Sequence, residues 1–122
     1  MDDMENVPRK RVLILDDETE LLGILSKMVG SFGMDAHATD DGEEAIKEHL
    51  SKRFDVMFVD LAMPKMSGQE FIYKVREING GPGPFIVIMT GLRDITLGSL
   101  DVNGIILKPF SSKTVAKALH GS

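Results

Sequence analysis

The sequence predicts an α/β protein in which one parallel β-sheet is covered by helices on both faces. Short apolar runs alternate with helical apolar patterns five times along the chain, and the runs are continuous, as strands buried on both faces are. The chain of 122 residues has room for one domain. Residues 1–10 have no apolar period and contain Pro8, so we expect a mobile N-terminal tail before a domain over residues 11–120.

The first two strands and the first helix follow from the apolar pattern. Val12–Leu15 is a continuous apolar run and predicts a buried strand. Apolar residues at helical spacing between positions 21 and 32 predict a helix that Gly33 ends. Residues 34–39 alternate apolar and polar side chains, which indicates a strand with one exposed side at an edge of the sheet.

The middle of the chain continues the alternation. Asp41 and Glu44 predict a capping box at the start of a second helix. The inward-facing residues of this helix are expected to be Ala45, Ile46 and Leu50. Ser67 is expected to cap a third helix, which the turn residues at 79–82 end. The remaining strands are predicted over Val56–Val59, Phe85–Met89 and Gly104–Leu107.

The fourth helix has the weakest pattern. Residues 91–103 should hold it, but their apolar period is poor and they include Gly98, which costs a helix about 1 kcal/mol relative to Ala. We therefore expect this helix to be short or irregular. A last helix follows, with Ser111 or Ser112 as its N-terminal cap.

The composition excludes several classes of protein. The absence of cysteine excludes disulfides and cysteine-ligated metal sites. The net charge of −5 argues against nucleic-acid binding, which requires clustered Lys and Arg. The apolar runs are far shorter than the ~20 residues of a membrane helix, and the acidic N-terminus is unlike a secretory signal. We therefore expect a cytoplasmic protein with neither nucleic-acid nor membrane partners.

Polar residues follow the strands at their C-terminal ends. They are Asp16 and Asp17 after the first strand, Asp60 after the third, Thr90 after the fourth and Lys108 after the fifth. Because these ends lie along one edge of a parallel sheet, the five side chains should meet. Carboxylates without His or Cys favour Mg²⁺, Ca²⁺ or Mn²⁺. Each residue alone is compatible with a cap or a turn, but together they predict phosphoryl transfer onto a carboxylate.

Four segments around these residues add a more specific signal. They are Val12-Leu-Ile-Leu-Asp-Asp-Glu18, Asp60-Leu-Ala-Met-Pro-Lys-Met-Ser-Gly68, Met89-Thr90-Gly91 and Lys108-Pro109-Phe110. In this order they resemble the receiver domains of two-component response regulators, and chemotaxis-type single receiver domains in particular. The resemblance extends from about Arg11 to Leu119. It implies a receiver domain over residues 11–120 with a flavodoxin-like, doubly wound sheet of strand order 2-1-3-4-5.

The resemblance also implies a phosphoacceptor and a cofactor. Asp60 matches the residue that takes a phosphoryl group from the phosphohistidine of a sensor histidine kinase or phosphotransfer protein. Asp17, Asp60 and the backbone carbonyl of Ala62 match the direct ligands of Mg²⁺. Asp16 matches the acid that reaches the metal through water.

The remaining implied roles belong to residues at the ends of the fourth and fifth strands. Thr90 matches the hydroxyl that moves onto the phosphate, and Lys108 matches the lysine that pairs with it. Pro109 matches a proline that follows a cis peptide bond. Such a domain catalyses its own phosphorylation and dephosphorylation but acts as a signalling phosphoacceptor rather than as an enzyme.

The sequence departs from the family on the face that signals to partners. Ile105 stands where an aromatic residue or His is usual, and the 17 residues between Thr90 and Lys108 are about one helical turn fewer than typical. The last helix is also short. We therefore expect phosphorylation to order residues 91–103 rather than to swing residue 105. The downstream partner is not identified by the sequence.

Three alternative functions compete with this hypothesis. A receiver-like interaction module would dock its partner whether or not it is phosphorylated, but it would not need the acidic residues. A flavodoxin-type protein would carry Ser, Thr and Gly for a flavin phosphate after the first strand. A haloacid-dehalogenase-type phosphatase would place its nucleophile after the first strand, whereas the acceptor here follows the third.

Overall fold

A single parallel sheet forms the centre of a computed structural model that describes residues 9–78, 83–91 and 100–121. Its strands are β1 (Arg11–Leu15), β2 (Asp35–Thr39), β3 (Val56–Asp60), β4 (Phe85–Thr90) and β5 (Gly104–Leu107). The helices within the described residues are α1 (Thr19–Ser31), α2 (Gly42–Lys52), α3 (Gly68–Ile78) and α4 (Ser112–His120). The strand order is β2-β1-β3-β4-β5, which confirms the predicted fold class and topology.

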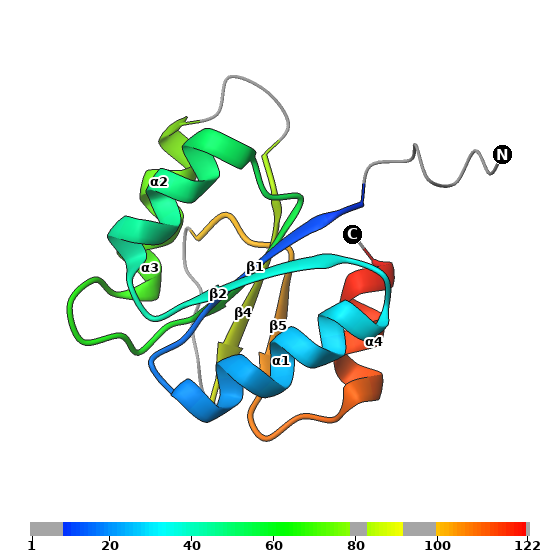
Figure 1. The fold of residues 1–122 in the computed structure, drawn as a ribbon. Coiled ribbons are helices and arrows are strands. Elements are labelled where there is room, and N and C mark those ends of the chain that lie inside the picture. The colour runs from blue at the N-terminus through cyan, green and yellow to red at the C-terminus, as the bar shows by residue number, and fades with distance from the viewer. Residues whose placement is uncertain (1–8, 79–82, 92–99, 122) are drawn as a thin grey trace, which may run out of the picture.

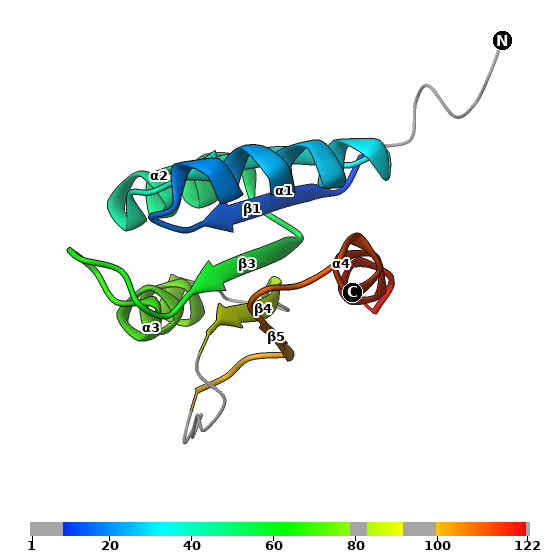
Figure 2. The ribbon, with the colours of Figure 1, turned by 90° about the horizontal axis from the view of Figure 1, so that it is seen from below.

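Pairs of helices cover opposite faces of the sheet (Figure 1, Figure 2). On one face, α1 and α4 bury Leu22, Leu25, Val29, Val115 and Leu119 against the strands. On the other face, α2 and α3 bury Ala45, Phe71, Ile72 and Val75. Successive strand residues point to alternate faces, so Val12 and Ile14 contact the first pair of helices while Leu13 and Leu15 contact the second.

The position of each strand in the sheet explains its apolar pattern. All five residues of β3 are buried, because this strand lies in the middle of the sheet and has helices on both faces. In contrast, β2 lies at an edge, and none of its residues is fully buried. The alternating sequence of residues 34–39 therefore predicted this edge strand correctly.

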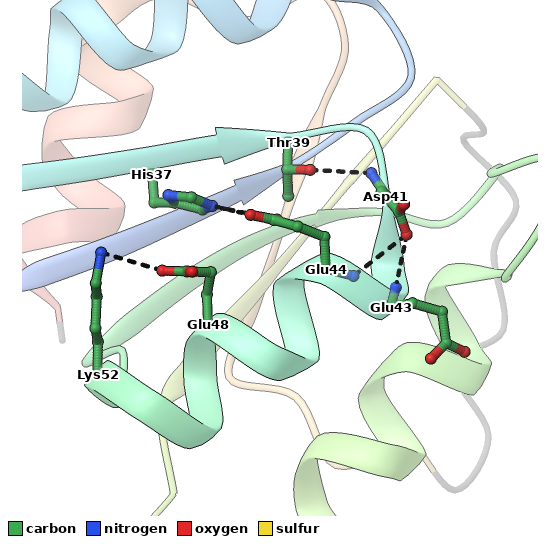
Figure 3. A network of polar contacts seen from close by, with 7 residues as sticks. All are labelled: His37, Thr39, Asp41, Glu43, Glu44, Glu48 and Lys52. Carbon is green, nitrogen blue, oxygen red and sulfur yellow. Dashed lines mark hydrogen bonds and ion pairs between the residues drawn. The ribbon is translucent and has the colours of Figure 1, made fainter.

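The start of α2 differs from the predicted capping box (Figure 3). The Asp41 carboxylate caps the helix as expected, accepting from the backbone N–H of Glu43 at 2.9 Å and of Glu44 at 3.3 Å. The Glu44 carboxylate does not return to the cap, however, but pairs with His37 Nε2 on β2 at 2.8 Å. The backbone N–H of Asp41 donates instead to the Thr39 hydroxyl at 3.1 Å. Of the two reciprocal contacts in the predicted capping box, only the one from the Asp41 side chain is formed.

The buried face of α2 also differs from the prediction. Leu50 is 53 % exposed, whereas its neighbour His49 is 1 % exposed and lies one turn beyond the buried Ala45. His49 is accommodated because its Nδ1 accepts the backbone N–H of Phe54 at 3.0 Å, and its ring stacks on the Phe54 ring. A buried polar group is tolerated when it is hydrogen-bonded in this way.

The other helix ends follow the predictions more closely. α1 ends at Ser31, and Gly33 beyond it has a φ of +80°, in the left-handed region that glycine adopts readily. Phe32, expected on the apolar face, is 39 % exposed at the C-terminal cap. The Ser67 hydroxyl accepts the backbone N–H of Glu70 at 3.1 Å at the start of α3. The N-terminal cap of α4 is Ser111, one of the two predicted candidates.

Two predictions fall on residues outside the described part of the chain. They are the mobile tail at residues 1–10, of which only 9 and 10 are described, and the short or irregular helix over residues 91–103, of which residues 92–99 are not described. Among the helices that are described, none has both the length and the apolar character needed to cross a bilayer.

Candidate functional site

Three aspartates meet at the C-terminal edge of the sheet, as the sequence predicts. Leu15 pairs with Val59 in parallel register, so the residues that follow them, Asp16 and Asp60, are brought side by side. One carboxylate oxygen from each of Asp16, Asp17 and Asp60 lies within 4.8 Å of the others. Within the described residues, this is the only such cluster of metal-ligating groups.

The loop after Asp60 is held close to the end of its strand. The Ala62 backbone N–H donates to Asp60 Oδ1 at 3.4 Å, and the Gly68 N–H donates to the Leu61 carbonyl at 3.0 Å. A Cβ atom on Gly68 would lie 2.5 Å from the carbonyl oxygen of Asp60 and 2.7 Å from the Cα of Leu61. Glycine is therefore required for α3 to begin directly against the end of β3.

Lys108 reaches into the aspartate cluster from the loop after β5. The Lys108–Pro109 peptide bond is cis, as the resemblance implies. The Lys108 backbone N–H donates to the Thr90 carbonyl at 2.7 Å, which ties the ends of β4 and β5 together. Its Nζ lies 2.8 Å from Asp16 Oδ2 and 3.8 Å from Asp60 Oδ1. Thr90 itself is buried at the end of β4.

Both oxygens of the buried Asp16 carboxylate already accept hydrogen bonds from the protein. Oδ1 accepts the backbone N–H of Glu18 at 2.9 Å, and Oδ2 accepts from Lys108 Nζ. Asp17, in contrast, is exposed. This difference favours Asp17 over Asp16 as a residue that can bind a cation directly.

Burial and neighbouring charge make Asp60 an unusual carboxylate. Its burial, reinforced by the negative charges of Asp16 and Asp17, raises the pKa of Asp60 to about 6, although Lys108 and the Ala62 N–H oppose the rise. For Lys108, burial opposes the charged form, but hydrogen bonds to Asp16 and to Glu18 outweigh it and raise the pKa of the ammonium. Lys108 is therefore positively charged at neutral pH.

The donor set fits a hard divalent cation. Among the described residues, the carboxylates of Asp16, Asp17 and Asp60 lie together, and the Lys108 ammonium contacts Asp16 and Glu18, so four carboxylates at the site outnumber this one ammonium. Oxygen donors without His or Cys are typical of Mg²⁺ sites, in which water and substrate oxygens complete the coordination. Burial is the main cause of the raised pKa of Asp60, and the negative charges of Asp16 and Asp17 add to it; a bound cation would offset this added repulsion.

Glu18 is the member of the site to which sequence reasoning assigned no role. Its carboxylate accepts from Lys108 Nζ at 3.0 Å, although the two residues lie 90 positions apart. Its place next to Asp16 and Asp17 was the only available signal, because a contact with the end of β5 is not visible in any local pattern.

Comparison with known proteins agrees with this geometry. The family model described as the response regulator receiver domain matches residues 12–120. The chain is 31 % identical over 115 residues to the probable transcriptional regulator ycf27 of Guillardia theta, covering 91 % of the chain and 44 % of that protein. It is 29 % identical over 106 residues to the DNA-binding response regulator MtrA of Mycobacterium tuberculosis, covering 86 % and 46 %. The chain thus spans less than half the length of these relatives.

Solved structures have the same fold. The chemotaxis response regulator CheY4 of Vibrio cholerae has a TM-score of 0.84 at 27 % identity and covers 93 % of this chain and 98 % of its own. The receiver domain of a sensor histidine kinase from Pseudomonas aeruginosa has a TM-score of 0.84 at 20 % identity, covering 94 % and 100 %, and holds a magnesium ion in its active-site cleft. The chain belongs to the response regulator receiver domain family of two-component systems.

Proposed function

We propose that the protein is a phosphoacceptor that takes a phosphoryl group from a phosphohistidine onto Asp60 with the help of Mg²⁺. The observation that supports this most directly is the juxtaposition of Asp16, Asp17 and Asp60 within 4.8 Å, with the ammonium of Lys108 beside them. The phosphoacceptor role is also the general function of the family to which the chain belongs.

In the proposed reaction, an oxygen of the Asp60 carboxylate attacks the phosphorus. A bond forms between this oxygen and phosphorus as the bond between phosphorus and the imidazole nitrogen of the donor breaks, and the imidazole leaves with the bonding electron pair. Above the raised pKa of about 6 the attacking carboxylate is ionised, so the nucleophile is available at neutral pH. A cation bound at Asp60 would favour the ionised form further.

Mg²⁺ would be held by Asp17, Asp60 and the Ala62 carbonyl, with Asp16 acting through water, and would neutralise charge on the phosphoryl oxygens. Asp16 also orients Lys108, because its Oδ2 holds the Lys108 ammonium at 2.8 Å.

Two further side chains would stabilise the phosphoryl group after transfer. The Lys108 ammonium, 3.8 Å from Asp60 Oδ1, is close enough to pair with a phosphoryl oxygen after a small movement. The Thr90 hydroxyl would donate a second hydrogen bond. Thr90 is buried and is joined to Lys108 through the backbone, so a movement of either residue would be transmitted to the other.

A groove beside the site supports a protein as the phosphodonor. It has a volume of about 410 Å³ and is lined by Glu18, Leu21, Ile24, Met28, Lys108, Pro109 and Phe110. Its apolar lining fits the side of a helix that carries a phosphohistidine, and its rim contains the ammonium that the transferred group would meet. We infer that a sensor histidine kinase or a phosphotransfer protein docks here. The predicted cytoplasmic location stays a prediction.

The signal would leave through the β5 side of the domain. Ile105 and Leu107 on this edge strand are 41 % and 42 % exposed, and such apolar side chains suit a contact that changes with phosphorylation. The Thr90 carbonyl contacts the residue that follows β5, so the edge strand is coupled to the acceptor site.

Intact-mass spectrometry tests the proposed function. The protein is incubated with acetyl phosphate and Mg²⁺, and one added phosphoryl group is expected. Chelation of the metal beforehand and the substitution Asp60→Asn should each abolish labelling, whereas Asp101→Asn, at an exposed carboxylate elsewhere, should leave it unchanged. Equal labelling of Asp60→Asn and the parent would exclude Asp60 as the acceptor. No labelling of the parent would favour an interaction module that does not depend on phosphorylation.

A further inference from the structure

Glu18 occupies the N-terminal cap position of α1 but does not use its side chain as a cap. Asp, Ser, Thr or Asn in this position would accept a backbone N–H of the first turn. The Glu18 carboxylate instead accepts from Lys108 Nζ at 3.0 Å. Its backbone N–H is bound to Asp16 Oδ1 at 2.9 Å, which fixes the direction from which the side chain reaches Lys108.

The Lys108 ammonium therefore lies closer to two of the acidic residues than to the third. It lies 2.8 Å from Asp16 and 3.0 Å from Glu18, within hydrogen-bonding distance of both, but 3.8 Å from Asp60. The residue that should neutralise charge at the acceptor is thus bound most closely to two other carboxylates.

We propose that Glu18 is a positioning residue that holds Lys108 away from Asp60 until the phosphoryl group arrives; this inference rests on the proposed function. When the bond between Asp60 and phosphorus forms and the donor bond breaks, two negative charges remain on the phosphoryl group. Lys108 then leaves Glu18 and pairs with a phosphoryl oxygen. Asp16 retains its contact with Lys108, because its carboxylate is fully buried and loses the ammonium at a greater cost than the exposed Glu18 carboxylate does.

The expected size of the effect follows from the exposure of the pair. The Glu18 side chain is 63 % exposed and that of Lys108 is 18 % exposed, so solvent weakens their attraction. Ion pairs of this kind contribute little, and their loss changes an equilibrium constant about two- to five-fold. Glu18 therefore adjusts the phosphorylation equilibrium without being required for the reaction.

The test measures binding of beryllofluoride, a phosphoryl analogue, in the presence of saturating Mg²⁺ for the parent and for Glu18→Gln. The variant should bind beryllofluoride about two- to five-fold more tightly, since Lys108 no longer has to leave a partner. The matched control is Glu20→Gln, which removes the same charge from the exposed first turn of α1 and should bind as the parent does. Circular dichroism melts of each variant verify folding.

The same substitution in a Lys108→Ala variant distinguishes loss of the contact with Lys108 from loss of a negative charge near the site. In Lys108→Ala protein, Glu18→Gln should change the affinity for beryllofluoride by less than the same substitution does in the parent, because the ammonium that it releases is absent. An equal gain in both backgrounds, an equal gain from Glu20→Gln, or no gain at all would overturn the role of Glu18. These outcomes differ from a failure of the proposed function, in which the parent would neither bind beryllofluoride nor accept a phosphoryl group.

Discussion

Replacing Asp60 by Asn should stabilise the protein in the absence of metal, and the gain should depend on pH. Asp60 is 6 % exposed, and its carboxylate is destabilised by burial and by the charges of Asp16 and Asp17. Asn has nearly the same shape and no charge, and its carbonyl oxygen can still accept the Ala62 N–H. The substitution therefore removes the repulsion while preserving the backbone contact.

The magnitude follows from the pKa of Asp60. A rise from 3.8 to about 6 corresponds to about 3 kcal/mol against the charged form in the folded protein. Because the native state binds this proton more tightly than the unfolded chain does, the contribution of Asp60 to the free energy of unfolding falls as pH rises from about 4 to about 6. The attraction of Lys108 is already included in this pKa, and solvent and relaxation of the site reduce the effect, so we expect a gain of about 1–3 kcal/mol above pH 6 and almost none at pH 4.

Urea denaturation followed by far-ultraviolet circular dichroism, with a chelator present at pH 4 and pH 7.5, measures this difference. Asp35→Asn is the control, since its exposed carboxylate lies 3.8 Å from Arg9 Nη1, and the substitution should change stability by less than about 1 kcal/mol at either pH. An Asp60→Asn variant that is less stable than the parent at pH 7.5, or that gains equally at both pH values, would refute the reasoning.

Three further predictions concern the metal, the core and the loop after Asp60. Millimolar Mg²⁺ should raise the melting temperature of the parent. Calorimetry should find that Asp17→Asn weakens Mg²⁺ binding more than Asp16→Asn does, because both Asp16 oxygens already accept hydrogen bonds from the protein. The reverse order would contradict the assignment of Asp17 as the direct ligand. His49→Leu should lower the free energy of unfolding by about 1–3 kcal/mol, since the buried N–H of Phe54 loses its acceptor, and unchanged urea stability would count against this. Gly68→Ala should lower the free energy of unfolding by about 1–3 kcal/mol, because its Cβ would overlap the backbone of Asp60 and Leu61 at the end of β3. It should also slow labelling by acetyl phosphate, and parent-like stability and labelling would show that the loop adapts.

The sheet and the aspartate cluster were predictable because each depends on short-range patterns. Continuous apolar runs identify strands that are buried on both faces, and the residue after each run must then lie at one edge of a parallel sheet. The sequence therefore predicts that Asp16, Asp60 and Lys108 meet, and in the structure they do.

The errors concern contacts that compete with local preferences. Hydrophobicity favours Leu50 over His49 as the buried residue of α2, but His49 is buried because its Nδ1 accepts the backbone N–H of Phe54 beyond the end of the helix. The local pattern predicts that Glu44 caps its own helix, but its carboxylate pairs with His37 on β2 instead (Figure 3). Glu18 meets Lys108 only because the sheet brings β1 and β5 residues to one edge. Such partners are decided by tertiary packing, which no local pattern contains.

The most direct test of the central claim is to identify the residue that carries the phosphoryl group. After incubation with acetyl phosphate and Mg²⁺, borohydride reduces an aspartyl phosphate to homoserine, and peptide mass mapping locates the changed residue. The account predicts reduction at Asp60 alone. Reduction at Asp16 or Asp17, or a phosphoryl group found on His37 or Thr90, would contradict it.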